Sequence, residues 1–255
     1  MASKQLRIGV FFPEGAQFLD AATVDVLASM SKEYLSPMAM LPKHIGAMAP
    51  STKITYITSP RLFPEVPFTA GLTVRATHTW EDKAVAPGQL DIVVVPGPDP
   101  TSTFEEGATE WLRKQYHTKG VDVLCICTGV FLCGAAGILE GKNVSGPRGL
   151  QDELAKRFPG VKLVGDKYRW VQDGNFWSSG GVTNGNDLMV AYARANSQHW
   201  PGPVAEIGAV LTDVGDRPQI FGEGQRRYVL GVAWQLVKGW LMSLVSSSKA
   251  KGKHI

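Results

Sequence analysis

The chain has 255 residues, of which 44% are hydrophobic and 19% are charged. These proportions are typical of a globular protein with a sizeable core. The net charge of +3 is small, and part of it lies in the C-terminal stretch SSSKAKGKHI. The body of the chain carries no basic run, so we expect no nucleic-acid partner.

The N-terminus and the hydropathy of the chain predict a cytoplasmic protein. The opening stretch MASKQLRIGVFF enters a strand pattern without an apolar segment of signal-peptide length. No window approaches 18 apolar residues, so we expect no membrane partner. The chain has 3 cysteines, an odd number, and two of them lie two positions apart. This pattern favours reduced thiols over a secreted disulfide scaffold.

The first half of the chain alternates predicted strands with helical and loop segments. Apolar runs rich in β-forming residues predict strands over 6–12, 53–59 and 90–97. The last of these is apolar nearly throughout, as in a strand covered on both faces. Apolar residues at helical spacing predict a turn and then a helix over 18–30. Three prolines predict a loop over 59–68, and residues 71–80 alternate like an edge strand or hairpin arm.

The second half continues the alternation of helices and strands. Its predicted elements, in chain order, are a helix over 108–119, a strand over 121–127, helices over 128–141 and 150–158, a hairpin over 168–181 turning at Asp173 and Gly174, a helix over 186–198 and an amphipathic helix over about 224–246. Alternating strands and helices predict a mostly parallel α/β sheet with helices on both faces. We expect one domain over 1–255 with its core at about 5–200, and a disordered tail over 247–255.

All three cysteines lie within one stretch of nine residues, at Cys125, Cys127 and Cys133. Their spacing does not match that of a structural zinc site, and no histidine is near in sequence, so no metal is expected. A disulfide between Cys125 and Cys127 would be strained, because both lie in one predicted strand. Free cysteine is among the most buried residue types, so the core is the expected place of Cys125 and Cys133.

Cys127 differs from the other two because an apolar strand ends there and a helix of small residues begins at Thr128. A nucleophile at such a sharp turn has its side chain exposed, and the positions two before and two after it must be small. These positions hold Cys125 and Gly129. The helix N-terminus is expected to favour the thiolate and to hold a developing anion. We therefore predict that Cys127 is a nucleophile.

The segment ICTGVFLCGAAGILEGK resembles the ThiJ/PfpI superfamily, whose members carry a cysteine at this turn. IGVFFPEGAQFLDAATVDVLA, LDIVVVPG and SSGGVTNGNDLMVAYA are similar to further segments of that superfamily, in the same order. The resemblance covers about residues 5–200. It implies a flavodoxin-like sandwich of the class I glutamine amidotransferase type, often assembled as a homodimer, that acts on a small molecule without a cofactor.

The stretch QFLD is similar to the isonitrile hydratase branch of the superfamily, which is shared with the sensor halves of some AraC-type regulators. The resemblance implies that Asp20 lies beside Cys127 and acts as an acid. Cys127 would attack the terminal carbon of an isonitrile, Asp20 would protonate that carbon, and water would release an N-substituted formamide. Taken alone, Asp20 would be better explained as a helix-start residue that interacts with the helix dipole, but the matching Cys127 favours the acid.

Two departures from the superfamily pattern bear on this function. Pro147 stands where many relatives have a histidine, so a Cys–His dyad from this segment is absent. Pro98 stands where relatives have a second glycine after Gly97, and proline has no backbone N–H to donate. Asp99 or Thr101 could replace the missing donor.

The resemblance also assigns residues to the pocket and leaves the reaction open. The predicted substrate-binding residues are Thr128, Gly129, Gly97, Asp99, Gly181 and Thr183. An isonitrile hydratase-like lyase is the leading hypothesis. A glyoxalase- or deglycase-like enzyme acting on reactive carbonyls and a thiol-based ligand or redox sensor are the alternatives. The C-terminal helix is expected to pack in the core or form a dimer contact.

Overall fold

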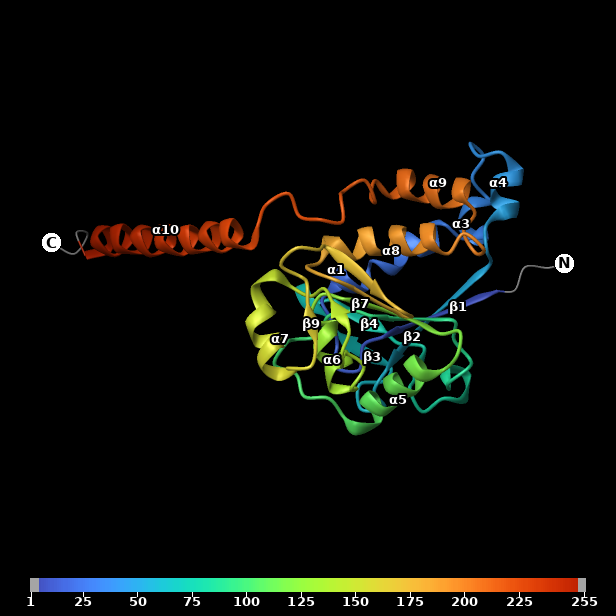
Figure 1. The fold of residues 1–255 in the computed structure, drawn as a ribbon, viewed down its shortest axis with the longest axis horizontal. Coiled ribbons are helices and arrows are strands. Elements are labelled where there is room, and N and C mark those ends of the chain that lie inside the picture. Colours follow the sequence, from blue (N-terminus) through green and yellow to red (C-terminus); the bar gives the residue numbers. More distant parts are fainter. Residues whose placement is uncertain (1–4, 252–255) are drawn as a thin grey trace.

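The computed structural model describes residues 5–251, with side chains up to residue 242. Its centre is a seven-stranded sheet in the order β10-β11-β7-β6-β1-β2-β5 (Figure 1). The strands of this sheet are β1 (Leu6–Phe11), β2 (Thr52–Thr58), β5 (His78–Thr79), β6 (Ile92–Val95), β7 (Asp122–Ile126), β10 (Trp170–Asp173) and β11 (Phe176–Ser179). Every neighbouring pair is parallel except the β10–β11 hairpin.

Helices cover both faces of this sheet, because its central strands are apolar on both sides. All four residues of β6 are buried, as expected for a strand between two layers. One layer contains α1 (Phe18–Ala21), α2 (Val24–Ser29), α3 (Lys32–Leu35), α4 (Lys43–Met48), α8 (Thr183–Ala195) and α9 (Gly202–Thr212). The other contains α5 (Glu106–His117), α6 (Gly129–Ala135) and α7 (Gln151–Arg157). The predicted mostly parallel, flavodoxin-like α/β fold is confirmed.

Short elements complete the fold. Two small sheets pair β3 (Glu65–Pro67) with β4 (Thr73–Arg75) and β8 (Asn143–Val144) with β9 (Lys162–Leu163). The 3₁₀ turns are η1 (Thr69–Gly71), η2 (Lys83–Val85) and η3 (Arg148–Leu150). β3 lies inside the segment predicted to be a loop. Proline is tolerated there because Pro67 ends an isolated two-stranded ladder.

The helix predicted over 18–30 is broken into α1 and α2. The Thr23 hydroxyl donates a hydrogen bond to the Asp20 carbonyl oxygen, at 2.8 Å. Such a side-chain bond competes with the helical backbone ladder. The break exposes Phe18 and Leu19, which were expected on an apolar face, and buries the side chain of Asp20 completely.

Two further boundaries differ from the prediction, and one helix was not predicted. The helix after Cys127 ends at Ala135, because Gly137 adopts a φ of +73° that stops a helix. The loop of the predicted hairpin is Gly174 and Asn175, one position later than expected, since Asp173 is still paired with Phe176. Helix α9 has no counterpart among the predicted elements.

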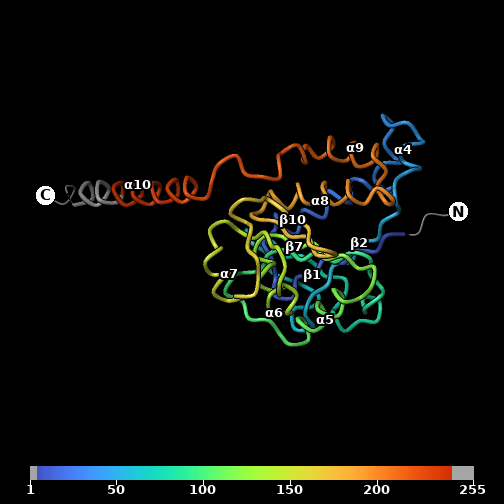
Figure 2. The backbone as a smooth tube through the Cα atoms, viewed as in Figure 1, coloured from blue at the N-terminus to red at the C-terminus, as the bar shows by residue number. Residues whose placement is uncertain are grey.

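The chain ends in a long helix, α10 (Gln225–Lys251), that projects from the body at the end of an extended linker (Figure 2). Its large apolar side chains are exposed, including Leu230, Trp234, Leu236 and Trp240. The expectation of core packing is therefore wrong for the described side chains. The helix also continues to Lys251, through lysine and alanine residues of good helix propensity, although 247–255 was predicted to be disordered. Residues 252–255 lie outside the described part of the chain. Over the described residues, no helix is both long and apolar enough to cross a bilayer.

Candidate active site

Cys127 lies at the sharp turn between β7 and α6, as the sequence predicts. Its φ of +55° is in the left-handed region, which costs a non-glycine residue on the order of 1–2 kcal/mol. The turn brings the chain close to its neighbours: a Cβ on Gly129 would overlap the carbonyl oxygen of Val95. Cys125 is fully buried in β7. The two small residues therefore flank the turn where the geometry requires them.

Asp20 lies in contact with Cys127, and its side chain is fully shielded from solvent. The Gly97 backbone N–H donates to Asp20 Oδ2 at 3.1 Å. The Gln17 N–H donates to the Gly97 carbonyl oxygen at 2.8 Å, which ties α1 to the loop after β6. The other carboxyl oxygen, Oδ1, is buried and has no hydrogen-bond partner of normal geometry. An acid therefore faces the thiol with one oxygen uncommitted.

Gly97 is packed so tightly that a side chain could not be added. A Cβ there would lie 2.5 Å from Asp20 Oδ2 and closer still to Thr128 Oγ1. The Thr128 hydroxyl donates to the Pro98 carbonyl oxygen at 2.7 Å. Gly97, Thr128 and Gly129 thus form the immediate wall around the thiol and the acid.

The loop after β6 has few N–H groups to offer a substrate. The Gly97 N–H is engaged by Asp20, and Pro98 has none. Of the suggested replacements, Thr101 donates both its N–H and its hydroxyl to Asp99 Oδ1, at 2.8 and 2.6 Å, and the Asp99 side chain is exposed.

The thiol and the acid have strongly shifted pKa values. Burial, reinforced by the negative charge of Asp20, raises the pKa of Cys127 to about 12. Burial raises the pKa of Asp20 to about 7, opposed by hydrogen bonds from the Gly97 N–H and the Cys127 thiol. The Thr128 N–H at the start of α6 and the Thr128 hydroxyl lower the pKa of Cys127, as expected for a helix N-terminus, but burial and Asp20 outweigh them in the resting site. Near neutral pH the Cys127 sulfur therefore keeps its proton, while the Asp20 carboxyl is about half ionised.

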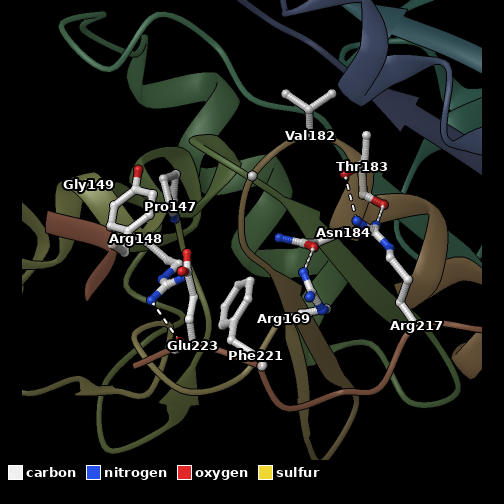
Figure 3. Close-up of a pocket in the computed structure, with 13 residues that line it drawn as sticks. Pro147, Arg148, Gly149, Arg169, Val182, Thr183, Asn184, Arg217, Phe221 and Glu223 are labelled. Atoms are coloured by element: carbon white, nitrogen blue, oxygen red, sulfur yellow. Dashed lines mark hydrogen bonds and ion pairs between the residues drawn. The ribbon is translucent and has the colours of Figure 1, made fainter. Parts of the chain in front are cut away.

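Gly181 and Thr183 line a cavity of about 730 Å³ whose lining residues do not include Cys127 or Asp20 (Figure 3). Pro147 and three arginines, Arg148, Arg169 and Arg217, line the same cavity. No sequence pattern predicted this arginine cavity, because its arginines are dispersed over 70 positions of the chain.

Three histidines of the chain, His78, His117 and His199, contact residues next to them in sequence. His78 Nδ1 lies 3.1 Å from Thr77 Oγ1, His117 packs on Tyr116, and His199 packs on Trp200. Among the described residues, no group of three or more His, Cys, Asp or Glu side chains is arranged to hold a metal ion.

Comparison with known proteins gives relatives for this chain and its fold. The profile of the DJ-1/PfpI family matches residues 30–195. An isonitrile hydratase of Pseudomonas putida is 33% identical over 133 residues, which is 51% of this chain and 54% of the relative. The match therefore spans about half the length of that curated relative.

Solved structures share the fold at low sequence identity. A THiJ/PfpI family protein from Pseudomonas syringae has a TM-score of 0.66 at 18% identity, over 93% of this chain and 88% of the other. Drosophila melanogaster DJ-1beta has a TM-score of 0.62 at 16% identity, over 83% and 99%. An AraC family transcriptional regulator from Pseudomonas putida has a TM-score of 0.61 at 16% identity, over 81% and 99%. The profile match over most of the chain, together with the cysteine turn in the expected fold, shows that this chain belongs to the DJ-1/PfpI family.

Proposed function

We propose that the chain is a cysteine-dependent hydratase of isonitriles, with Cys127 as nucleophile and Asp20 as the group that moves the proton. The observation that carries this proposal is the buried contact between the two side chains, with one Asp20 oxygen uncommitted. A carboxyl with a pKa of about 7 can both take and return a proton near neutral pH. The similarity to an isonitrile hydratase supports the choice of substrate class.

The first step uses the resting protonation state. The Asp20 carboxylate takes the thiol proton while Cys127 Sγ attacks the terminal carbon of R–N≡C, forming the C–S bond. The neutral Asp20 then returns the proton to that carbon, which gives the thioimidate R–N=CH–S. Burial of both groups keeps solvent from competing for the proton.

The second step uses water as the co-reactant. Water adds to the thioimidate carbon, one of its protons goes to nitrogen, and the C–S bond breaks. The products are the formamide R–NH–CHO and the protonated thiol. Gly97, Thr128 and Gly129 would form the wall against which the substrate lies. These steps use the thiol, the carboxyl and water, and require no cofactor.

The loop after β6 favours an isonitrile over a carbonyl substrate. Attack on a carbonyl develops a negative oxygen, which needs preorganised N–H donors. Here Gly97 N–H is engaged by Asp20 and Pro98 has no N–H. Attack on an isonitrile instead develops negative charge on carbon, and the remedy is a proton from a nearby acid. Asp20 is in position to supply it.

The assay that tests this proposal offers the purified chain an alkyl isonitrile and methylglyoxal in parallel. We expect the isonitrile to yield the N-alkylformamide, measured by NMR or mass spectrometry, and methylglyoxal to yield no lactate. Lactate formation would replace the hydratase with the carbonyl-directed alternative. Turnover of neither compound, together with ready oxidation of Cys127 to a sulfinic acid by peroxide, would instead favour the thiol-based sensor.

We further propose that the chain is a cytoplasmic homodimer, with α10 contributing to the contact between copies. The three free thiols favour a reducing compartment. The described part of α10 exposes apolar side chains on several sides, and a second copy of the same helix would cover them. The chain thus supplies its own complementary apolar surface.

Leu236→Lys is expected to shift the full-length protein from dimer to monomer, because it puts a charge on an apolar side chain that is 70% exposed in the isolated chain. Light scattering coupled to size exclusion measures the change. Gln235→Lys, at a polar exposed position next to it, is the control and should remain dimeric. A wild-type protein that is monomeric throughout, whether or not it binds lipid vesicles, would contradict the dimer.

A further inference from the structure

The lining of the arginine cavity does not include Cys127 or Asp20, and it is built from distant parts of the chain. Arg148 follows β8, Arg169 precedes β10, and Arg217 and Phe221 lie in the linker between α9 and α10. The linker is held against the body: Arg169 N donates to Gln219 O at 2.7 Å, and Phe221 N donates to Lys167 O at 3.0 Å. The cavity is therefore part of the folded body.

Two of the three arginines have acidic partners and the third does not. Arg148 lies 3.8 Å from Glu223 Oε1, and Arg217 pairs with Asp187. Arg169 Nε donates to Pro218 O at 3.1 Å. Its Nη1 donates to Asn184 Oδ1 at 3.3 Å (Figure 3). Both acceptors are neutral. Within the described residues, Arg169 has no ion pair, and most of its five N–H groups have no acceptor.

Other positively charged groups lie close to Arg169. The Arg148 and Arg169 guanidinium carbons lie 4.3 and 4.4 Å from the centre of the same Phe221 ring, which holds two like charges close together. Burial and the charges of Arg217 and Arg148 lower the pKa of Arg169, with Asp187 opposing. The first turn of α8, at Val182 and Thr183, also lines the cavity and adds the positive end of a helix dipole.

We propose that this cavity binds a small organic anion whose carboxylate or phosphate group pairs with Arg169 between Arg148 and Arg217. An anion there supplies the missing acceptor and offsets the repulsion among the three guanidinium groups. The proposal goes beyond the hydratase function and does not depend on it, because the cavity does not include the catalytic pair.

The dimensions of the cavity favour an organic ligand over an inorganic ion. A volume of about 730 Å³ is that of a small-molecule site and far exceeds the volume of one phosphate ion. Phe221, Tyr228 and Val182 supply apolar lining beside the arginines. The ligand expected here has an acidic group at one end and an apolar or aromatic body at the other.

Calorimetric titration of the full chain with benzoate, phenyl phosphate and inorganic phosphate tests this inference. Benzoate or phenyl phosphate should bind saturably and more tightly than inorganic phosphate, and the better of the two identifies the acidic group. Arg169→Gln should weaken that binding roughly tenfold or more, as expected for loss of a charged hydrogen-bond donor. Arg113→Gln, which removes an exposed arginine on α5, should leave the affinity unchanged.

A second pair of variants tests the site without removing an arginine. Gly222 lines the cavity and has open space where a Cβ would be, so Gly222→Asp adds a carboxylate beside the arginines without a clash. It should abolish binding of the aromatic anion, whereas Gly224→Asp, two residues along and also unobstructed, should not. The proposal is overturned by absence of saturable binding, by inorganic phosphate binding as tightly as the aromatic anions, or by equal affinity in Arg169→Gln and Arg113→Gln.

Discussion

Cys127→Ala is expected to lower formamide production from an isonitrile by roughly a thousandfold or more, because the C–S intermediate can no longer form. The variant should keep the fold, since alanine fits the space of the thiol and the left-handed φ of the turn is unchanged. Initial rates by NMR, with circular dichroism to check folding, give the measurement.

Cys133→Ala is the matched control for this loss. Cys133 is fully buried in α6, and its thiol interacts with that of Cys125 behind the turn. Removing it leaves a small cavity but does not touch the Cys127–Asp20 pair. The variant should retain turnover close to that of the wild type. Equal loss in both variants, or activity of Cys127→Ala close to that of the wild type, would contradict the assignment of the nucleophile.

Asp20→Asn is expected to lower turnover roughly a hundredfold or more, because the amide cannot accept and return the proton. The same substitution should stabilise the fold at alkaline pH. Burial raises the pKa of Asp20 from 3.8 in the unfolded reference to about 7 in the fold. Between these values the unfolded chain releases a proton that the folded chain keeps, so stability falls as the pH rises from about 4 to about 7.

The size of this stability effect follows from the shift of the pKa. At about 1.36 kcal/mol per pKa unit, ionising Asp20 in the fold costs up to about 4 kcal/mol by pH 8. Denaturant unfolding of wild type and Asp20→Asn at pH 4.5 and pH 8 should show the variant more stable at pH 8, with the difference shrinking at pH 4.5. Asp25→Asn, an exposed aspartate on α2, should show no such dependence. An Asp20→Asn variant destabilised equally at both pH values would contradict a buried carboxyl with a raised pKa.

Loss of activity without the stability gain would separate two roles of Asp20. If turnover falls while the stability difference stays flat with pH, the carboxyl acts on the substrate but is not buried as the fold places it. If stability rises at pH 8 while turnover persists, the acid is buried but not needed for the chemistry. Both the catalytic and the electrostatic arguments are therefore open to test with one substitution.

The central sheet and the turn at Cys127 could be read from the sequence because both depend on local patterns. Apolar runs at 90–97 and 121–127 are long enough to identify strands covered on both faces. A strand that ends in cysteine and passes at once into Thr128 and Gly129 predicts the sharp turn. Gly129 is required there because the Val95 carbonyl oxygen occupies the place of a side chain.

The boundaries that failed depend on competing contacts. The break between α1 and α2 follows from the Thr23 hydroxyl bond to the Asp20 carbonyl oxygen, which helical periodicity does not encode. Helix α10 has the apolar content of a buried helix, yet its described side chains lie in solvent in the single chain. Hydrophobic periodicity indicates which residues of a helix are expected to be buried, but it does not identify the surface that covers them.

The sequence by itself determined the fold class and the nucleophile candidate, and its resemblance to a known family pointed to Asp20 as the acidic partner. Only the tertiary structure decided the shifted pKa values of Cys127 and Asp20, and it showed that the Gly97 N–H donates to Asp20 and is not left for a substrate. It also brought Arg148, Arg169 and Arg217 around one cavity. Backbone conformation and hydrophobic periodicity are properties of a few consecutive residues, so a sequence displays them. Desolvation and charge–charge interactions depend on which distant side chains the fold brings within a few ångströms, so they are settled only when the chain is folded.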